Sequence, residues 1–195
     1  MKKYAVLDYS HLLGMPGFSE TLLKNHFTLY QGYVTNTNKV METLEAMLKE
    51  GKQADYEAAE LRRRLGWEWN GMRLHELYFE NLGGDGDPTK APTVMKAFEA
   101  QFGSFDAWAK EFNAAATMRG IGWVVLYQDI AQGLLINQWI NEHDVGHCAG
   151  LNPILVLDCF EHAFMIDYGL KRADYIAAFM KNIKWEEVEK RYVKK

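Results

Sequence analysis

The chain has 195 residues, of which 48% are hydrophobic and 13% aromatic, so it has enough apolar material for one large core or two small layers that share an interface. Its formal net charge of -4 argues against a nucleic-acid surface as the main function. The only two cysteines, Cys148 and Cys159, lack both metal-type spacing and the density of a disulfide scaffold, which favours a reducing, cytoplasmic setting. No apolar stretch approaches the length of a membrane span, so no membrane partner is expected.

A first long helix is predicted over residues 20–51. Its partly apolar stripe consists of Leu22, Leu23, His26, Tyr30, Tyr33, Val34, Val40, Leu44 and Leu48. At about 100° per residue, His26, Tyr30 and Tyr33 share one face, whereas Asn25 points away from it. This face suits a metal-binding histidine flanked by two tyrosines, and it also suits an ordinary aromatic interface.

A second helical region follows, and its C-terminal part, residues 65–82, is dense in aromatic side chains and contains His75. The Gly-Gly-Asp-Gly-Asp-Pro sequence at residues 83–88 ends this region. It predicts a domain boundary, with a helical N-terminal domain over residues 1–86 and a mixed C-terminal domain over residues 87–195.

The C-terminal half mixes helices and strands. Two helices are predicted over residues 92–102 and 104–117, and Ser104 is a predicted N-cap, as Ser19 is for the first helix of the chain. Three strands are predicted over residues 120–127, 134–140 and 154–157, the first two joined by a turn at Gln132-Gly133. Further helices are expected through Trp185 and Tyr192.

Asp158 ends the last predicted strand, and His162 follows four residues later. Loops and helix starts at strand ends often carry chemistry, and an Asp and a His this close can both turn toward one metal ion. The pair also fits a helix-capping aspartate beside a satisfied histidine at the edge of the core. Together with His26 and His75, it provides three imidazoles and one carboxylate, a set that suits a first-row transition ion with one open position.

The sequence from Asp158 to Phe164, Asp-Cys-Phe-Glu-His-Ala-Phe, resembles the Asp-x-Trp-Glu-His-Ala-Tyr signature of iron/manganese superoxide dismutases. Further segments resemble this family in the same order: Leu7-Asp8-Tyr9, Tyr33-Val34-Thr35-Asn36, residues 71–81, Phe102-Gly103-Ser104-Phe105, Gly120-Ile121-Gly122-Trp123, and residues 171–175 and 182–185. The resemblance therefore covers almost the whole chain. It implies an α+β fold, in which a long N-terminal helical hairpin precedes an α/β domain with a three-stranded antiparallel sheet, and a metal site between the domains.

The resemblance implies four ligands for one Fe or Mn ion per subunit, with solvent as a fifth ligand: His26, His75, Asp158 and His162. Two alignments of the first ligand are open. Read backward from Tyr33 without a gap, the position falls on Asn25, and read forward from Ser19 it falls on His26, with one residue missing afterwards. The regular helical register of His26 with Tyr30 and Tyr33 favours His26.

The resemblance also implies that Tyr33 and His143 orient solvent and protons in catalysis. Gly71 stands where many iron enzymes of the family carry a Gln that tunes the metal. His143 stands where manganese enzymes carry that Gln and where some iron enzymes place a His. This combination makes iron the first choice and manganese the second, while an exposed loop histidine remains an alternative interpretation of His143.

Two departures from the family concern the entrance to the site. Tyr30 replaces a histidine of the first helix, and Met165 replaces the tyrosine that normally partners it across the subunit interface. Glu161, which in the family reaches the metal-binding histidine of the partner subunit, is retained. A homodimer with Glu161 and His162 at the interface, or a tetramer, is therefore implied.

The function implied by the resemblance is disproportionation of superoxide to oxygen and hydrogen peroxide by redox cycling of a single Fe or Mn ion. Superoxide is then the substrate, with no nucleic-acid or membrane partner. A non-catalytic metal-binding or structural member of the same fold is the main alternative, and the altered Tyr30/Met165 pair favours it. Another metal-dependent redox enzyme on the same scaffold is a third interpretation, because a fold does not fix a function.

Overall fold

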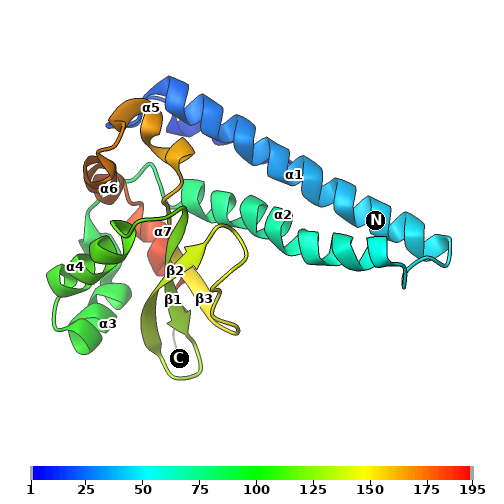
Figure 1. Cartoon of the computed structure of the whole chain (residues 1–195). Helices are drawn as coiled ribbons and strands as arrows, with labels where there is room; N and C mark the ends of the chain where they lie inside the picture. Colours follow the sequence, from blue (N-terminus) through cyan, green and yellow to red (C-terminus); the bar gives the residue numbers. More distant parts are fainter. Residues whose placement is uncertain (1, 194–195) are drawn as a thin grey trace.

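The structure is a computed structural model that describes residues 2–193. The predicted domain ranges, 1–86 and 87–195, thus include three residues outside the described part, residues 1, 194 and 195. Two antiparallel helices, α1 (Glu20–Lys49) and α2 (Tyr56–Glu80), form a long hairpin that projects from the α/β part (Figure 1). This arrangement confirms the predicted fold class.

Helix α1 begins where the sequence predicts. The Ser19 hydroxyl accepts a hydrogen bond from the Leu22 amide at 3.1 Å, which satisfies one of the free N–H groups of the first turn. In the predicted stripe Tyr33 is half-buried and the other residues up to Leu44 are buried, but at the outer end of the hairpin Leu48 is 59% exposed and Met47 is buried instead. Including Leu48 in the stripe was therefore wrong, because the packing at the end of the hairpin buries Met47, three residues after Leu44, instead of Leu48.

The remaining elements follow in chain order: η1 (Ser10–Leu12), η2 (Pro88–Lys90), α3 (Pro92–Phe102), α4 (Phe105–Ala116), β1 (Gly122–Asp129), β2 (Leu134–Asn141), β3 (Asn152–Asp158), η3 (Glu161–Ala163), α5 (Met165–Tyr168), α6 (Arg172–Lys181) and α7 (Trp185–Arg191). The predicted helices and strands are confirmed in kind and order, with β1 lying two residues later and β3 starting two residues earlier than expected. Ser104 caps α4 through a 3.0 Å bond from the Ala107 amide. Among the helices within residues 2–193, none is long and apolar enough to cross a lipid bilayer.

The sheet is antiparallel with the strand order β2-β1-β3. Helix α4 packs against β1 and β2, α3 packs against β2, and α2 and α7 contact β3. All residues of β1 except the last are buried, as expected for a central strand that is covered on both faces. In the register between β1 and β3, Trp123 lies opposite Asp158, so a large indole stands beside the carboxylate at the end of β3.

Asn81, at the C-terminal end of α2, ties the hairpin to the sheet. Its fully buried side chain accepts a hydrogen bond from the Val156 amide of β3 at 2.9 Å and donates one to the Tyr78 carbonyl at 2.9 Å. Its own carbonyl accepts from the Lys184 amide at 2.9 Å, just before α7. One residue therefore fixes the relative position of α2, β3 and α7 in the part of the molecule where the candidate ligands lie.

We expect Asn81→Ala to lower the free energy of unfolding by about 1–3 kcal/mol, because the Val156 amide is left buried without a partner. Urea unfolding followed by circular dichroism measures the change. The matched control is Asn36→Ala on the exposed face of α1, which should change the stability by no more than about 0.5 kcal/mol. Equal effects of the two substitutions would contradict this role of Asn81.

Candidate metal centre

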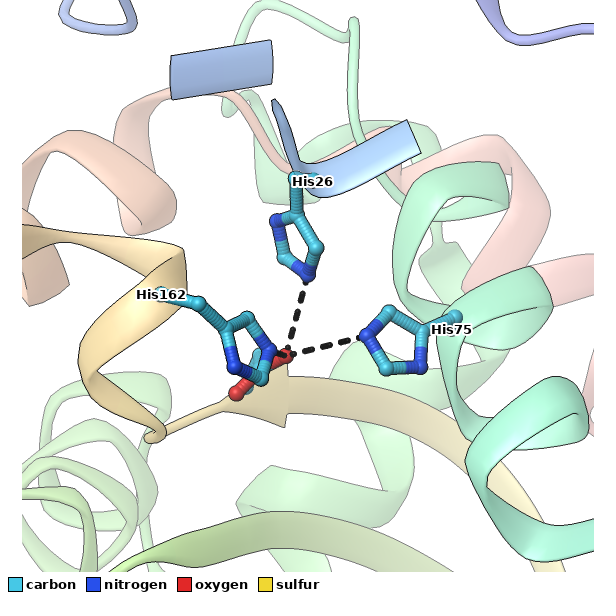
Figure 2. A group of neighbouring side chains, drawn as sticks. His26, His75 and His162 are labelled. Atoms are coloured by element: carbon cyan, nitrogen blue, oxygen red, sulfur yellow. Dashed lines mark hydrogen bonds and ion pairs between the residues drawn. The ribbon is translucent and has the colours of Figure 1, made fainter. Parts of the chain in front are cut away.

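Four side chains from four elements converge at the junction of the hairpin and the sheet, and Figure 2 labels the three histidines among them. They come from α1, α2, the end of β3 and η3 respectively: His26, His75, Asp158 and His162. One potential ligand atom from each lies within 4.8 Å of those of the other three. The first three residues are buried, and the His162 side chain is 27% exposed. The structure thus brings together all four predicted metal ligands.

The Asp158 carboxylate lies at the centre of this cluster. Its Oδ2 lies 3.2 Å from Nε2 of His26, 3.0 Å from Nε2 of His162 and 3.7 Å from Nε2 of His75. Its Oδ1 accepts a hydrogen bond from the Phe160 amide at 2.8 Å. Burial by itself raises the pKa of Asp158, but the adjacent His162 and His26 outweigh it and hold the pKa below its usual value. The carboxylate is therefore ionised and offers a negative charge inside the protein.

His75 has the hydrogen bonding of a metal ligand. Its Nδ1 lies 2.5 Å from the Gly71 carbonyl oxygen, which only accepts, so Nδ1 carries the hydrogen and Nε2 has a free lone pair. That Nε2 is buried and has no hydrogen-bond partner. Burial lowers the pKa of His75 well below its usual value and also lowers that of His26, which keeps both imidazoles neutral. A buried, unpartnered nitrogen that faces an ionised carboxylate fits a bound cation.

The two alignments of the first ligand differ clearly in three dimensions. His26 is 2% exposed and its ring points into the cluster, as Figure 2 shows. Asn25, about 100° away around α1, is exposed. Of these two residues, only His26 lies in the cluster, which agrees with the helical-register argument.

Tyr33 and His143 lie next to the cluster and contact each other. Tyr33 stacks on the His75 ring with centroids 5.2 Å apart, and its hydroxyl lies 2.6 Å from Nε2 of His143. The indole Nε1 of Trp123, which can only donate, lies 3.1 Å from Nδ1 of His143. Nδ1 is therefore the acceptor, and Nε2 carries the hydrogen that is donated to Tyr33. Burial lowers the pKa of His143 to about 4, which keeps this imidazole neutral.

His143 is fully buried, so the alternative of an exposed loop histidine is wrong. Phe160 covers one face of its ring with centroids 4.8 Å apart, and Trp67 meets its edge at 4.9 Å. The loop after β2 therefore turns this side chain inward, between aromatic rings, rather than outward to water.

Tyr30 has a different environment from the one that its position on the ligand-bearing face suggests. Its hydroxyl donates to Oε1 of Glu76 at 2.9 Å and accepts from the Leu7 amide at 3.2 Å. Glu76 is buried and also pairs with Arg73 at 2.5 Å. Tyr30 thus connects the N-terminal segment to α2. Met165, the other substituted position, is 46% exposed.

Two family models match the chain and together span most of it. Residues 3–83 match the alpha-hairpin domain of iron/manganese superoxide dismutases, and residues 89–191 match the C-terminal domain of the same family. The chain belongs to the iron/manganese superoxide dismutase family. The four converging ligands are thus the His/His/Asp/His metal site of a superoxide dismutase.

Relatives of this dismutase include enzymes named for either metal. The iron superoxide dismutase of Aquifex pyrophilus is 38% identical over 194 residues, which cover 96% of this chain and 90% of the relative. A manganese superoxide dismutase of Haloferax volcanii is 34% identical over 187 residues, covering 95% and 92%. The iron enzyme of Saccharolobus solfataricus is 34% identical over 200 residues, covering 99% and 95%. Fe or Mn at the four-residue site is consistent with all three.

Several hydrogen-bonding residues near the site had no clear signal in the sequence: Glu76, Trp123, Tyr127 and His147. Each of them forms a hydrogen bond with a residue in another part of the chain or in a neighbouring segment of the sheet and its loop, so neighbouring residues in the sequence do not reveal the contact. The four-residue spacing of Trp123 to Tyr127 and of His143 to His147 was visible in the sequence. It becomes informative only when the two segments are known to lie side by side.

We expect His26→Ala to reduce the metal content of the purified dismutase about tenfold or more, because one of four ligands is lost. Asn25→Ala, the matched control one position away on the exposed face, should retain the wild-type content. Metal analysis of the folded proteins by mass spectrometry measures both. Loss of metal from the Asn25 variant alone would overturn this assignment of the first ligand.

Proposed function

We propose that this dismutase uses iron in preference to manganese, with one ion per subunit. We also propose that four residues hold the ion directly: His26, His75, Asp158 and His162. The observation that carries this proposal is the buried, unpartnered Nε2 of His75, which faces the ionised Asp158 in a cluster of three imidazoles. The preference for iron rests on the combination of Gly71 with His143.

An iron or manganese ion held by His26, His75, Asp158 and His162 would supply one-electron redox chemistry, in which one superoxide is oxidised to oxygen and a second is reduced, with two protons, to hydrogen peroxide. We propose that Tyr33 and His143 are the residues that orient solvent and protons in this reaction. Because His143 donates to the Tyr33 hydroxyl, the hydroxyl hydrogen of Tyr33 remains available for donation toward the site. Burial raises the pKa of Tyr33 to about 12, so the hydroxyl is protonated at neutral pH.

The steric environment of Gly71 supports this role of His143. A Cβ atom at position 71 would lie 2.4 Å from Cδ1 of Tyr33, so the tyrosine ring occupies the space that a side chain on α2 would need. A hydrogen-bond donor at position 71 is therefore incompatible with this position of Tyr33. The donor has to come from another element, and His143 on the loop after β2 is in contact with the Tyr33 hydroxyl.

We further propose that the dismutase forms a homodimer, with Glu161 and His162 at the interface. Glu161 is exposed and lines a surface depression of ≈ 770 Å³ beside Met165 and Leu170, which are 46% and 91% exposed. An apolar surface of this kind next to a part-exposed metal ligand is suited to a second copy of the chain. A tetramer built from two such dimers is the other assembly that the resemblance implies.

The domain boundary and the cellular location also remain proposals. A boundary between residues 86 and 87 falls in the gap between the two family matches, which end at residue 83 and begin at residue 89. Cys148 and Cys159 are both free thiols, which suits a reducing compartment and supports a cytoplasmic location.

The decisive experiment is the decay of a superoxide pulse with the protein loaded separately with iron and with manganese. We expect catalytic decay with both metals, faster with iron, and a slower decay with Tyr33→Phe than with the wild type. Metal-free protein is the control. Faster decay with manganese would contradict the choice of iron, and decay at the control rate in metal-loaded protein would contradict the proposed catalytic site.

Sedimentation equilibrium tests the assembly. We expect a species of twice the chain mass or more, and we expect Glu161→Ala to shift it toward monomer, because the substitution removes a charged contact near the centre of the interface. Glu57→Ala, on the exposed outer part of the hairpin, is the matched control and should leave the mass unchanged. A wild-type monomer at micromolar concentration would refute the dimer.

A further inference from the structure

Two pairs of side chains connect β1 to the loop that follows β2. Trp123 and Tyr127 are four residues apart on β1 and therefore point to the same face of the strand. His143 and His147 are likewise four residues apart on the loop. The Trp123 indole donates to Nδ1 of His143 at 3.1 Å, and the Tyr127 hydroxyl lies 2.8 Å from Nδ1 of His147. The second pair thus repeats the first pair at the outer end of the strand.

His147 also contacts His143 directly, through the main chain. Its Nε2 lies 2.8 Å from the His143 carbonyl oxygen, which only accepts, so Nε2 carries the hydrogen. In the neutral imidazole, Nδ1 then accepts from the Tyr127 hydroxyl. Tyr127 is 4% exposed, and burial raises its pKa to about 12, so this hydroxyl keeps its hydrogen at neutral pH. The Tyr127 hydroxyl therefore donates to His147, and His147 donates to the main-chain carbonyl of His143.

The loop between β2 and β3 depends on such contacts for its shape. Glu142 has a positive φ of 51°, and Gly146 has a φ of 106°, a region that residues with a side chain rarely adopt. Asn141 and Val145 exchange main-chain hydrogen bonds of 2.8 and 3.3 Å, which close the base of the turn. The hydrogen bond from His147 to the His143 carbonyl closes the loop a second time. It restrains the main chain of His143, the residue whose imidazole contacts Tyr33.

These contacts do not form a route for protons. The Trp123 indole nitrogen has no lone pair to accept a proton, and the His143 carbonyl has no proton to pass on. The function that the geometry leaves for Tyr127 and His147 is to hold His143 in place. A bond of 2.6 Å to the Tyr33 hydroxyl is sensitive to small displacements of the loop.

We propose that His147, held by Tyr127, is a positioning residue that fixes the His143 main chain so that the His143 imidazole meets the Tyr33 hydroxyl. The inference rests on the proposed role of His143 in catalysis. It extends the site from the residues around the metal to the outer end of β1, and it assigns a function to two residues that do not touch the site.

The test is made on iron-loaded protein with two measurements, the midpoint reduction potential of the bound iron and the steady-state kinetics of superoxide decay. We expect His147→Leu to lower kcat about fivefold with little change in KM, the size of effect that one neutral hydrogen bond provides. The potential should move in the same direction as in His143→Ala, by a smaller amount. Tyr127→Phe should give a shift of the same sign, smaller again.

His147→Gln is the rescue variant, because its amide retains one donor and one acceptor on a common carbon, as the imidazole does; it should restore most of the kcat and the potential. Val145→Thr, an exposed position in the same loop, is the matched control and should behave as the wild type.

A wild-type potential in both His147→Leu and Tyr127→Phe, even with lowered thermal stability, would overturn the proposal. If His147→Leu fails to fold, Tyr127→Phe and His147→Gln decide it. An inactive wild type would instead refute the proposed function.

Discussion

The ionised Asp158 carboxylate, enclosed at the end of β3, is the constraint on which the rest of the structure depends. An isolated buried charge is costly, and hydrogen bonds alone offset only part of that cost. Here Oδ1 of Asp158 accepts a hydrogen bond from the Phe160 amide, and the Asp158 main-chain carbonyl accepts one from the Tyr175 hydroxyl at 2.7 Å. Its Oδ2, however, faces His26 and His75, and burial lowers the pKa of both imidazoles and so favours their neutral form. A cation held by the four ligands compensates the negative charge of the buried Asp158. The metal site is therefore part of what allows this carboxylate to be buried in the fold.

The hairpin is organised so that opposite ends of its two helices meet at this carboxylate. His26 lies near the start of α1 and His75 near the end of α2, and antiparallel packing brings the two positions together beside the sheet. The outer part of the hairpin has a separate small core of Val40, Leu44, Met47 and Ala58. The site-bearing ends are therefore stabilised by the α/β part, and the projecting end is stabilised by its own contacts, so the two can vary independently.

The features that the sequence predicted well are those whose signals are local. Ser19 and Ser104 mark helix starts through their own side chains, and the period of apolar residues places His26 on the inner face of α1. The four metal ligands were also identified in advance, because Asp158 and His162 are close in sequence and the order of the surrounding motifs resembled one family. Local pattern and family resemblance were enough for the fold class and the ligand set.

The features that the sequence did not predict depend on partners far away in the chain. Nothing near Tyr30 indicates that its hydroxyl bonds to Glu76, 46 residues later, and to the Leu7 amide. The same holds for Asn81, whose side-chain oxygen accepts a hydrogen bond from the main chain of β3 at Val156, 75 residues later in the chain. The prediction that Leu48 lies in the buried stripe was wrong for a more local reason. The apolar period fits both Leu48 and Met47, and the packing at the end of the hairpin buries Met47.

The spacing between His26 and Tyr33 explains why these long-range contacts are needed. Seven residues correspond to about two helical turns, so Tyr33 lies on the same face as His26 and its ring rests against α2 at Gly71. With that space filled, position 71 of α2 has no room for a side chain, and the hydroxyl of Tyr33 is contacted by His143 on the loop after β2. A donor on a loop is positioned less rigidly than one on a helix. The contact of Tyr33 with Gly71 thus leaves the Tyr33 hydroxyl to a side chain of the loop, which is itself bonded to β1 through Trp123.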